Sequence, residues 1–418
     1  MAFYLGLDFG TSGMRAIVLD QDKQIQFQAS GRYPQHNLDW AKTWTQGLRE
    51  LLSQIPEVLR RSLQGIAIDG TSASVLFCNA QGKPVAPPLL YNDARGASFL
   101  EQVRSIAPPN HVTLSATSSL TKLLWASHQP WFSEVRFLLH QADWLGFLLH
   151  GHFGISDYHN CLKLGYDVEQ LQYPNWLTRS SWASYLPETV LTPGQPIAPV
   201  LPDWVDRYHL PANCQVCAGT TDSIAAFLAS GASRPGEAVT SLGSTLVVKL
   251  LSRHRIDDAR YGLYSHRLGN DWLVGGASNT GGAVLNRYFS PQELQRLSEQ
   301  IKDDQESPLD YYPLLEPGER FPINDPQLLP RLEPRPTDSV QFLHGLLESM
   351  ARIEARGYHL LQELGADPLL QVYTAGGGAG NEAWKGIRAR HLGVPVLPSA
   401  HTEAAYGTAL LARQGGQS

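Results

Sequence analysis

The stretch LDFGTSGMRA, residues 7–16, decides the fold. An apolar run ends at Asp8, a tip of glycine and hydroxyl residues follows, and a second apolar run leaves from residue 16. This pattern predicts two strands joined by a turn whose N–H and O–H groups can bind phosphate. A carboxylate beside such a turn would repel phosphate unless a cation lay between them, so the tip also predicts Mg²⁺ held by Asp8.

Three further turns have the same composition, and each follows an apolar run. They are residues 219–222, 243–245 and 376–381. Small residues let a backbone approach a ligand closely and aim N–H groups at it. One such turn is usually only a turn. Four of them, spread over both halves of the chain, predict a cleft that holds a polyphosphate.

Short apolar strands alternate with helical patterns along the chain, which indicates an α/β architecture. Residues 63–79 repeat the strand–tip–strand scheme of the N-terminus, and residues 236–250 repeat it in the second half. A chain of 418 residues is expected to form two domains, so we predict a duplicated core with a boundary near residue 230. Residues 290–337 are rich in proline and charge and are expected to form a surface excursion. Apolar spacing from residue 340 to 353 predicts a helix with its stripe in the core.

Composition excludes several classes of protein. The formal net charge is -6 without a dense Lys/Arg cluster, which argues against nucleic acid or an anionic membrane as the main partner. No apolar stretch approaches the ~20 residues that span a bilayer, and the N-terminus lacks a secretion signal. We therefore expect a cytoplasmic protein, or one in an organelle stroma after loss of a transit peptide. The pair Cys214 and Cys217 is expected to be buried in a strand. P-loop, dinucleotide and serine-hydrolase patterns are absent.

Five segments occur in order between residues 4 and 412: DFGTSGMRA, CAGTTDSIAAFLASG, SLGSTL, GGASNTGGAVLNRY and GGGAGNEAWKGIRARHLGVPV. Together they resemble the FGGY carbohydrate kinases, and the chain is most similar to the pentulose (D-ribulose or D-xylulose) kinases. The resemblance implies the two-domain, duplicated α/β fold of actin, hexokinase and Hsp70, which is ribonuclease H-like and has a central cleft. Residues 1–229 would form the N-terminal domain on the sugar and phosphate side. Residues 230–418 would form the C-terminal domain on the nucleotide side.

The resemblance also implies roles for individual residues. Asp222 would be the general base that takes the proton of the sugar hydroxyl, and Asp8 would support Mg²⁺ and the reacting hydroxyl. Trp384 would lie near the base of ATP. Taken alone, Asp222 is more often only the N-cap of a helix. The residues that would contact ATP are small or polar and come from both domains: Gly10, Thr11, Ser12, Arg15, Ser244, Thr245, Gly281, Gly377, Gly378 and Asn381.

The implied reaction transfers the γ-phosphate of ATP to the terminal hydroxyl of a pentulose. The loop IDGTSAS resembles the D-A-T-C-S loop of D-ribulose kinases more than the M-H-G loop of bacterial xylulose kinases. We therefore predict that Asp69, Thr71 and Ser72 bind and select the sugar, with D-ribulose first and D-xylulose as the alternative. The chain departs from the family at Tyr91, where a tryptophan usually precedes N-D-x-R. A non-catalytic ATP-binding member of the same superfold is the other alternative.

Overall fold

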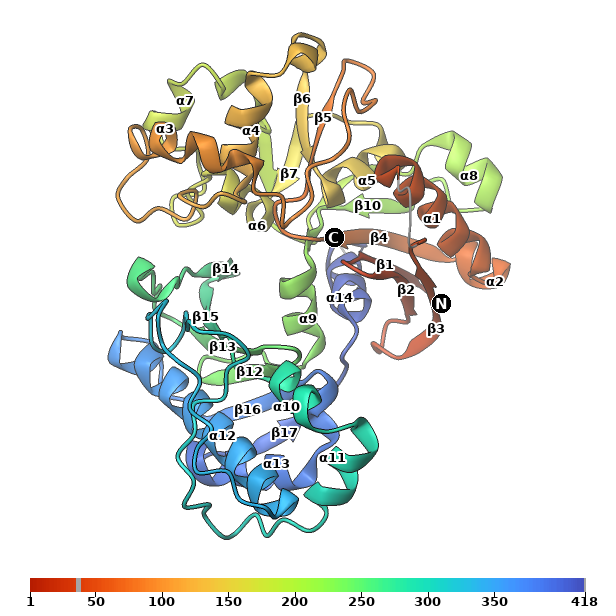
Figure 1. Ribbon diagram of the computed structural model, residues 1–418. Coiled ribbons are helices and arrows are strands. Elements are labelled where there is room, and N and C mark those ends of the chain that lie inside the picture. Colours follow the sequence, from red (N-terminus) through yellow and green to blue (C-terminus); the bar gives the residue numbers. More distant parts are fainter. Residues whose placement is uncertain (35–38, 417–418) are drawn as a thin grey trace. The chain divides into compact units, whose positions relative to one another are not determined.

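The computed structural model describes residues 1–34 and 39–416 and divides the chain into two compact units (Figure 1). Unit 1 comprises Met1–Ala229 and Glu403–Ser418, and unit 2 comprises Ser230–Thr402. Unit 2 is thus inserted into unit 1, whereas the sequence predicted two consecutive domains. The difference arises because the C-terminal helix α14 packs on the first strand of the chain. None of the described helices is long and apolar enough to cross a membrane.

Unit 1 is built on a mixed sheet with the strand order β3-β2-β1-β4-β10-β9, in which β11 also pairs with β4. Strands β1 to β3 are antiparallel neighbours, and β4 runs parallel to β1. The parallel register places Asp8 beside Asp69, and Thr220 on β11 lies opposite Asp69 on its other side. The strands are β1 (Phe3–Phe9), β2 (Gly13–Leu19), β3 (Ile25–Arg32), β4 (Leu63–Gly70), β9 (Pro196–Pro199), β10 (Gln215–Cys217) and β11 (Thr220–Thr221).

Successive side chains of β1 point to opposite faces of this sheet, and each face has its own cover. Leu5 and Leu7 pack with α1, α5 and α8, whereas Tyr4 faces α14. Gly6 lies on the α14 face, where a Cβ would come 2.1 Å from the carbonyl oxygen of Ala405. The helices of unit 1 are α1 (Trp40–Gln54), α2 (Glu57–Arg60), α3 (Leu100–Arg104), α4 (Ser119–Ser127), α5 (Gln141–His150), α6 (Tyr158–Cys161), α7 (Asn175–Thr178), α8 (Pro202–Tyr208), α9 (Asp222–Ala229) and α14 (Ala404–Gly416).

The hairpin expected over residues 63–79 does not form. β4 is paired with β1 on one side and with β10 and β11 on the other, so it has no free edge for the following strand. That strand, β5 (Val75–Cys78), pairs instead with β6 (Phe137–His140). A second small sheet joins β7 (Ile155–Asp157) to β8 (Thr189–Leu191). Strands β5 and β6 and helix α4 contribute to a separate apolar core within unit 1.

Unit 2 repeats the scheme of the unit 1 sheet. Its sheet has the order β14-β15-β13-β12-β16-β17, with β12, β13 and β15 antiparallel and β16 parallel to β12. This repeat confirms the predicted duplication of the core. The elements are β12 (Glu237–Leu242), β13 (Leu246–Ser252), β14 (His266–Leu268), β15 (Asp271–Ser278), β16 (Gln371–Ala375), β17 (Val396–Pro398), α10 (Gly282–Tyr288), α11 (Pro291–Ser298), α12 (Ser339–Glu363) and α13 (Glu382–Leu392).

The segment predicted as a surface excursion is more deeply embedded than expected. It opens with the helix α11, and beyond it Tyr311 and Phe321 are buried in the core of unit 2. The Phe321 ring occupies the space that a Cβ would need at Gly276, 2.4 Å away. Isolated aromatic residues among prolines have no periodic spacing, so the sequence pattern could not show that they are buried.

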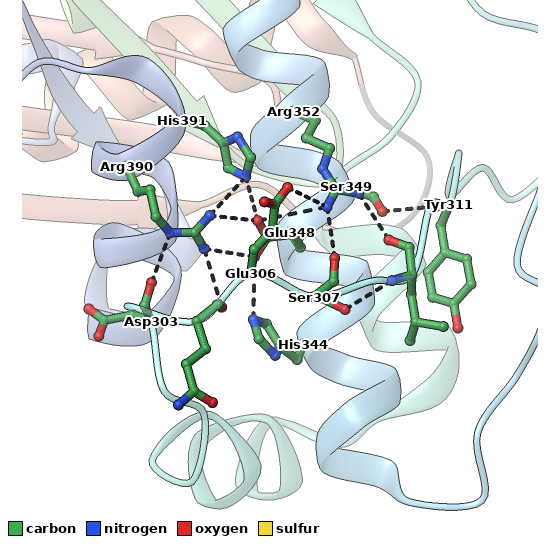
Figure 2. Close-up of polar contacts among 12 residues, drawn as sticks. Asp303, Glu306, Ser307, Tyr311, His344, Glu348, Ser349, Arg352, Arg390 and His391 are labelled. Carbon is green, nitrogen blue, oxygen red and sulfur yellow. Dashed lines mark hydrogen bonds and ion pairs between the residues drawn. The ribbon is translucent and has the colours of Figure 1, made fainter.

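Helix α12 carries Glu348, a fully buried carboxylate surrounded by arginine and histidine side chains (Figure 2). Arg390 binds both of its oxygens at 2.9 Å, and His391 and His344 also contact it. Ligand atoms of Glu306, Glu348 and His391 lie within 4.8 Å of one another, which is a spacing compatible with a metal ion. Because a guanidinium already occupies both oxygens of Glu348, we interpret the cluster as an ion-pair network that joins α12 to α13.

This network predicts a pH-dependent contribution to stability. Burial acts to raise the pKa of Glu348, but hydrogen bonds and charges from Arg390 and His391 lower that pKa to about 2. Its stabilising effect is therefore present above about pH 4.5 and is lost as the pH falls towards 2. Glu348→Gln should lower the free energy of unfolding at pH 7 by on the order of 2 kcal/mol, allowing for solvent screening.

Thermal unfolding between pH 3 and pH 7 checks this expectation. The difference between wild type and Glu348→Gln should shrink as the solution is acidified. Glu363→Gln is the matched control, because Glu363 lies on the same helix and pairs with His359 on the exposed surface. It should cost less than about 1 kcal/mol at either pH. A wild-type advantage that stays constant down to pH 3 would contradict the low pKa of Glu348.

Candidate active site

The turn between β1 and β2 is the tip that the sequence singled out. The N–H of Gly10 donates to the carbonyl oxygen of Gly13 at 3.0 Å and closes the turn. The side chains of Thr11 and Ser12 are exposed at this tip. A Cβ at Gly13 would lie 2.4 Å from the carbonyl oxygen of Gly31 on β3, so only glycine fits there without a shift of the backbone. The hydroxyl groups are thus presented to solvent on a rigid turn.

A pair of buried carboxyl groups lies beneath this tip. Asp8 and Asp69 sit side by side on parallel strands, and both are fully buried. Asp8 Oδ2 accepts a hydrogen bond from Arg15 at 3.0 Å, and Asp69 Oδ2 accepts one from Thr408 on α14. Among the described residues, no N–H or hydroxyl group donates to Oδ1 of either carboxyl. A proton held by one of the two carboxyls would reduce the repulsion between them.

The electrostatics of the pair agree with one proton on the two carboxyls. Burial raises the pKa of Asp8, although its contacts with Asp69 and Arg15 act in the opposite direction. Burial also raises the pKa of Asp69 well above its usual value, and the charges of Asp8 and Asp222 raise it further. Two carboxylates in one dry site cannot both ionise at low cost, and burial with neighbouring negative charge raises the pKa of Asp69 more strongly than that of Asp8.

Asp222 is the third carboxylate of this site. It is the first residue of α9, directly after strand β11, which pairs with β4 at Asp69. Its Oδ1 accepts a hydrogen bond from the N–H of Ser223 at 2.6 Å, and its side chain is partly exposed. The structure therefore brings together the two predicted catalytic residues, Asp8 and Asp222, with Asp69 between them in the strand order.

The predicted sugar-selecting residues have different environments. Thr71 is buried, and both its N–H and its hydroxyl donate to Oε1 of Gln141 at 2.9 Å. Its hydroxyl also pairs with Ser74 at 2.6 Å, so Thr71 holds its own loop together. Ser72 is partly exposed. Of the three residues predicted to select the sugar, Asp69 and Thr71 are buried and hydrogen-bonded to other side chains. Ser72 is the one with an accessible side chain.

Unit 2 contains a pocket of about 790 Å³, which is in the size range of small-molecule sites. Four of the predicted ATP-binding residues line it: Ser244, Gly377, Gly378 and Asn381. Thr245 and Gly281 are not among its lining residues. Gly281 has a φ of +144°, and a Cβ there would meet the backbone of Thr245 at 2.7 Å. These two residues thus lie behind the residues that line the pocket.

Asn381 and Trp384 shape the pocket in a way that the sequence did not reveal. Asn381 caps α13 by accepting a hydrogen bond from the N–H of Trp384 at 2.9 Å, and it donates to Ser298 on α11 at 2.8 Å. Helix α11 therefore forms part of the wall, through residues such as Leu294 and Gln295. The capping box that opens this helix at Ser290 was the signal that could have identified it.

The structure also gives Arg15 a second partner that sequence reasoning missed. Arg15 was predicted to bind ATP, and its guanidinium contacts Asp8 at 3.0 Å and Glu403 at 2.6 Å. Glu403 follows unit 2 in the chain and immediately precedes α14, so no local motif connects it with the tip. The guanidinium is partly exposed and can still face an anionic ligand.

Two family models match the chain. The N-terminal domain of the FGGY family of carbohydrate kinases matches residues 3–228, and the C-terminal domain of that family matches residues 238–414. The chain belongs to the FGGY family of carbohydrate kinases. It is therefore an ATP-dependent phosphotransferase that acts on a carbohydrate.

Curated relatives of this FGGY kinase include the xylulose kinase of Streptomyces coelicolor, which is 28% identical and is matched over 97% of this chain and 86% of its own length. The xylulose kinase of Bacillus subtilis is 23% identical over 99% of this chain and 88% of its own length. Among solved structures, xylulose kinase from Rhodospirillum rubrum superposes with a TM-score of 0.84 at 22% identity, covering 99% of this chain and 90% of that one. The structure of Plasmodium falciparum glycerol kinase with ADP superposes with a TM-score of 0.83 at 17% identity, covering 99% of this chain and 89% of that one. These structures confirm the predicted fold.

Proposed function

We propose that this FGGY kinase transfers the γ-phosphate of ATP to the terminal hydroxyl of a pentulose, with D-xylulose as the acceptor. The observation that carries the proposal is the buried carboxyl pair, Asp8 and Asp69, next to Asp222 at the start of α9. The names of the relatives favour D-xylulose over the D-ribulose that the loop predicted. D-ribulose remains the second candidate, because residues 68–74 resemble the loop of D-ribulose kinases.

Asp222 is the general base in this proposal. It is the first residue of α9, and its side chain is partly exposed whereas Asp8 and Asp69 are buried. With one proton between them, Asp8 and Asp69 together carry one negative charge beside Asp222 rather than two. Asp222 can then accept the proton of the sugar hydroxyl as the phosphoryl group is transferred.

The carboxyl pair also fits the Mg²⁺ that the family implies. Oδ1 of Asp8 has no N–H or hydroxyl donor among the described residues, and carboxylate oxygens are the ligands that Mg²⁺ prefers. Asp8 would hold the ion, as the sequence predicted. A bound Mg²⁺ would neutralise charge on the phosphate oxygens. Arg15 bridges Asp8 and Glu403 and fixes the orientation of Asp8.

We place the adenosine of ATP in the unit 2 pocket, against Trp384 and the glycine turn 376–381. This turn and the tip at Ser244 lack bulky side chains, so the nucleotide can approach the backbone closely. The exposed hydroxyls of Thr11 and Ser12 in unit 1 are proposed to bind phosphate oxygens. Phosphoryl transfer needs positioning and charge neutralisation more than covalent chemistry, and these groups supply both.

A panel of acceptors tests the proposed function. ADP release with Mg²⁺ and ATP is measured for D-xylulose, D-ribulose, glycerol and D-glucose, with the acceptor-free rate subtracted. We expect kcat/KM for D-xylulose to exceed that for glycerol and D-glucose by at least about 100-fold, because a site shaped for one acceptor's hydroxyls rejects others strongly. A higher value for D-ribulose than for D-xylulose would select the second candidate. A higher value for glycerol or D-glucose than for both pentuloses would reject the proposal.

A further inference from the structure

Lys122 is a fully buried lysine whose partners are backbone carbonyl groups. It lies on α4, between leucines that form the core of this part of unit 1. Its Nζ donates to the carbonyl oxygen of Ala73 at 2.7 Å and to that of Leu90 at 2.6 Å. The sequence SLTKLLWAS gives no hint of this arrangement, because a lysine in a helix is normally exposed.

The two carbonyl groups belong to two different loops, each of which was compared with a family motif in the sequence. Ala73 follows Ser72 in the loop IDGTSAS and has a positive φ of 61°, which is rare for alanine. Leu90 directly precedes the motif YNDARG, in which Tyr91 is exposed. One amine therefore connects two loops through carbonyl groups that lie seventeen positions apart in the sequence. Their separation at this point is fixed by the length of two hydrogen bonds.

The same helix supports the second loop at another point. Arg95 pairs with Asp93 at 2.6 Å, and its guanidinium lies 4.6 Å from the ring centre of Trp125 on α4. A Cβ at Gly96 would come 2.6 Å from Thr121, so α4 packs directly against this loop. Helix α4 thus acts as a common base for residues 71–74 and 90–96.

Burying a lysine at this position is unfavourable in free energy. Burial lowers the pKa of Lys122 to about 7, although the charge of Asp93 acts in the opposite direction. An apolar side chain would fit the leucine core without this cost, but it would remove the amine from the carbonyl of Ala73 and leave the carbonyl of Leu90 with only the N–H of Asp93, at 2.9 Å. An uncharged amine still has two N–H groups, so it can serve both carbonyls in either protonation state.

We propose that Lys122 is a positioning residue for the sugar acceptor, which fixes the loops at Ser72 and Tyr91 relative to each other. This inference rests on the proposed function, since it takes these loops as the sugar-binding part of unit 1. The amine does not touch the sugar. It acts by holding the backbone from which the accessible side chains of both loops extend.

Lys122→Met tests the inference with the best acceptor of the panel. We expect KM for the sugar to rise about 10-fold to 100-fold, since small displacements of positioning groups have effects of this size. KM for ATP should stay within about twofold, because the nucleotide pocket is in unit 2 and touches neither loop. Lys122→Arg retains donors for both carbonyls and should lie between wild type and Lys122→Met.

Leu124→Ala is the matched control, because Leu124 is fully buried on the same helix but contacts neither carbonyl through a hydrogen bond. It should lower Tm without changing KM for the sugar. If Lys122→Met does not accumulate as folded protein, the comparison is made between Lys122→Arg and wild type. An unchanged KM for the sugar in the lysine variant, or an equal rise in Leu124→Ala, would overturn the inference.

Hydrogen exchange without any substrate separates this inference from the proposed function. In Lys122→Met, amides in residues 70–76 and 89–96 should exchange at least about tenfold faster, whereas amides of unit 2 should not change. Absence of pentulose turnover in wild type would defeat the proposed function and leave this measurement intact. Unchanged exchange in both loops would defeat the role of Lys122 whatever the acceptor.

Discussion

Replacing Asp222 by Asn is expected to lower kcat for sugar phosphorylation by about 10²–10⁴-fold. The amide keeps the shape of the side chain and can still accept the hydrogen bond from Ser223, but it cannot take a proton. Tm should not fall, because the change removes a negative charge from the neighbourhood of the buried carboxyl of Asp69. ATP binding, measured by calorimetry, should survive since the base acts on the sugar hydroxyl.

Asp203→Asn is the matched control for this experiment. Asp203 is also an acidic residue in the first turn of a unit 1 helix, α8, but it is exposed and is not part of the carboxylate cluster. It should leave kcat unchanged. Near-normal phosphorylation by Asp222→Asn would assign Asp222 a purely structural role at the start of α9 and would reject it as the general base.

Gly6→Val is expected to produce the largest loss of stability. A Cβ at Gly6 would lie 2.1 Å from the carbonyl oxygen of Ala405 and 2.2 Å from the backbone nitrogen of Ala409. Both neighbours are backbone atoms of α14, so no side chain can rotate away to make room. Overpacking typically costs 1–3 kcal/mol, and a clash between backbones should cost at least about 3 kcal/mol. That corresponds to a fall in Tm of roughly 6–12 °C for a unit of this size.

Calorimetry of the thermal transition and limited proteolysis near residue 403 measure this effect. Gly146→Ala is the control, because a Cβ there would meet its nearest neighbour, the His150 ring, at an ordinary 3.5 Å. Gly146 lies within α5, where alanine is the better helix former, so Tm should stay the same or rise. A Gly6→Val protein with the Tm of wild type would show that α14 is not docked on β1 at this glycine.

The fold class could be predicted because its signals are local. The tip after Asp8 and the turn before Asp222 can each be read from a few consecutive residues, and the family match confirms the fold that they predicted. The roles of these residues in catalysis stay predictions. The prediction of a hairpin over residues 63–79 was wrong. Which strands pair depends on which edges of the sheet are free, and the sequence of one strand does not show this.

Other parts of the candidate site depend on contacts between distant segments. Asp69 was predicted from the sequence to bind the sugar, which stays a prediction, and the parallel register with β1 also makes it the buried neighbour of Asp8. Glu403 and Lys122 have ordinary sequence surroundings and acquire their partners only through the fold. The choice between D-xylulose and D-ribulose likewise depends on side-chain geometry that a loop motif does not specify.

The return of α14 to unit 1 has a consequence for the order in which the nascent chain can fold. A ribosome completes all of unit 2 before it makes the helix that covers β1 and β4. At 5–20 residues per second, the sheet of unit 1 waits on the order of 10–30 s with the face around Gly6 uncovered. Unit 2 is translated second but is the first to have its whole sequence available. Unit 2 can therefore complete its fold before unit 1 does, and Tyr4 and Ala67 are buried side chains that stay uncovered until α14 is made.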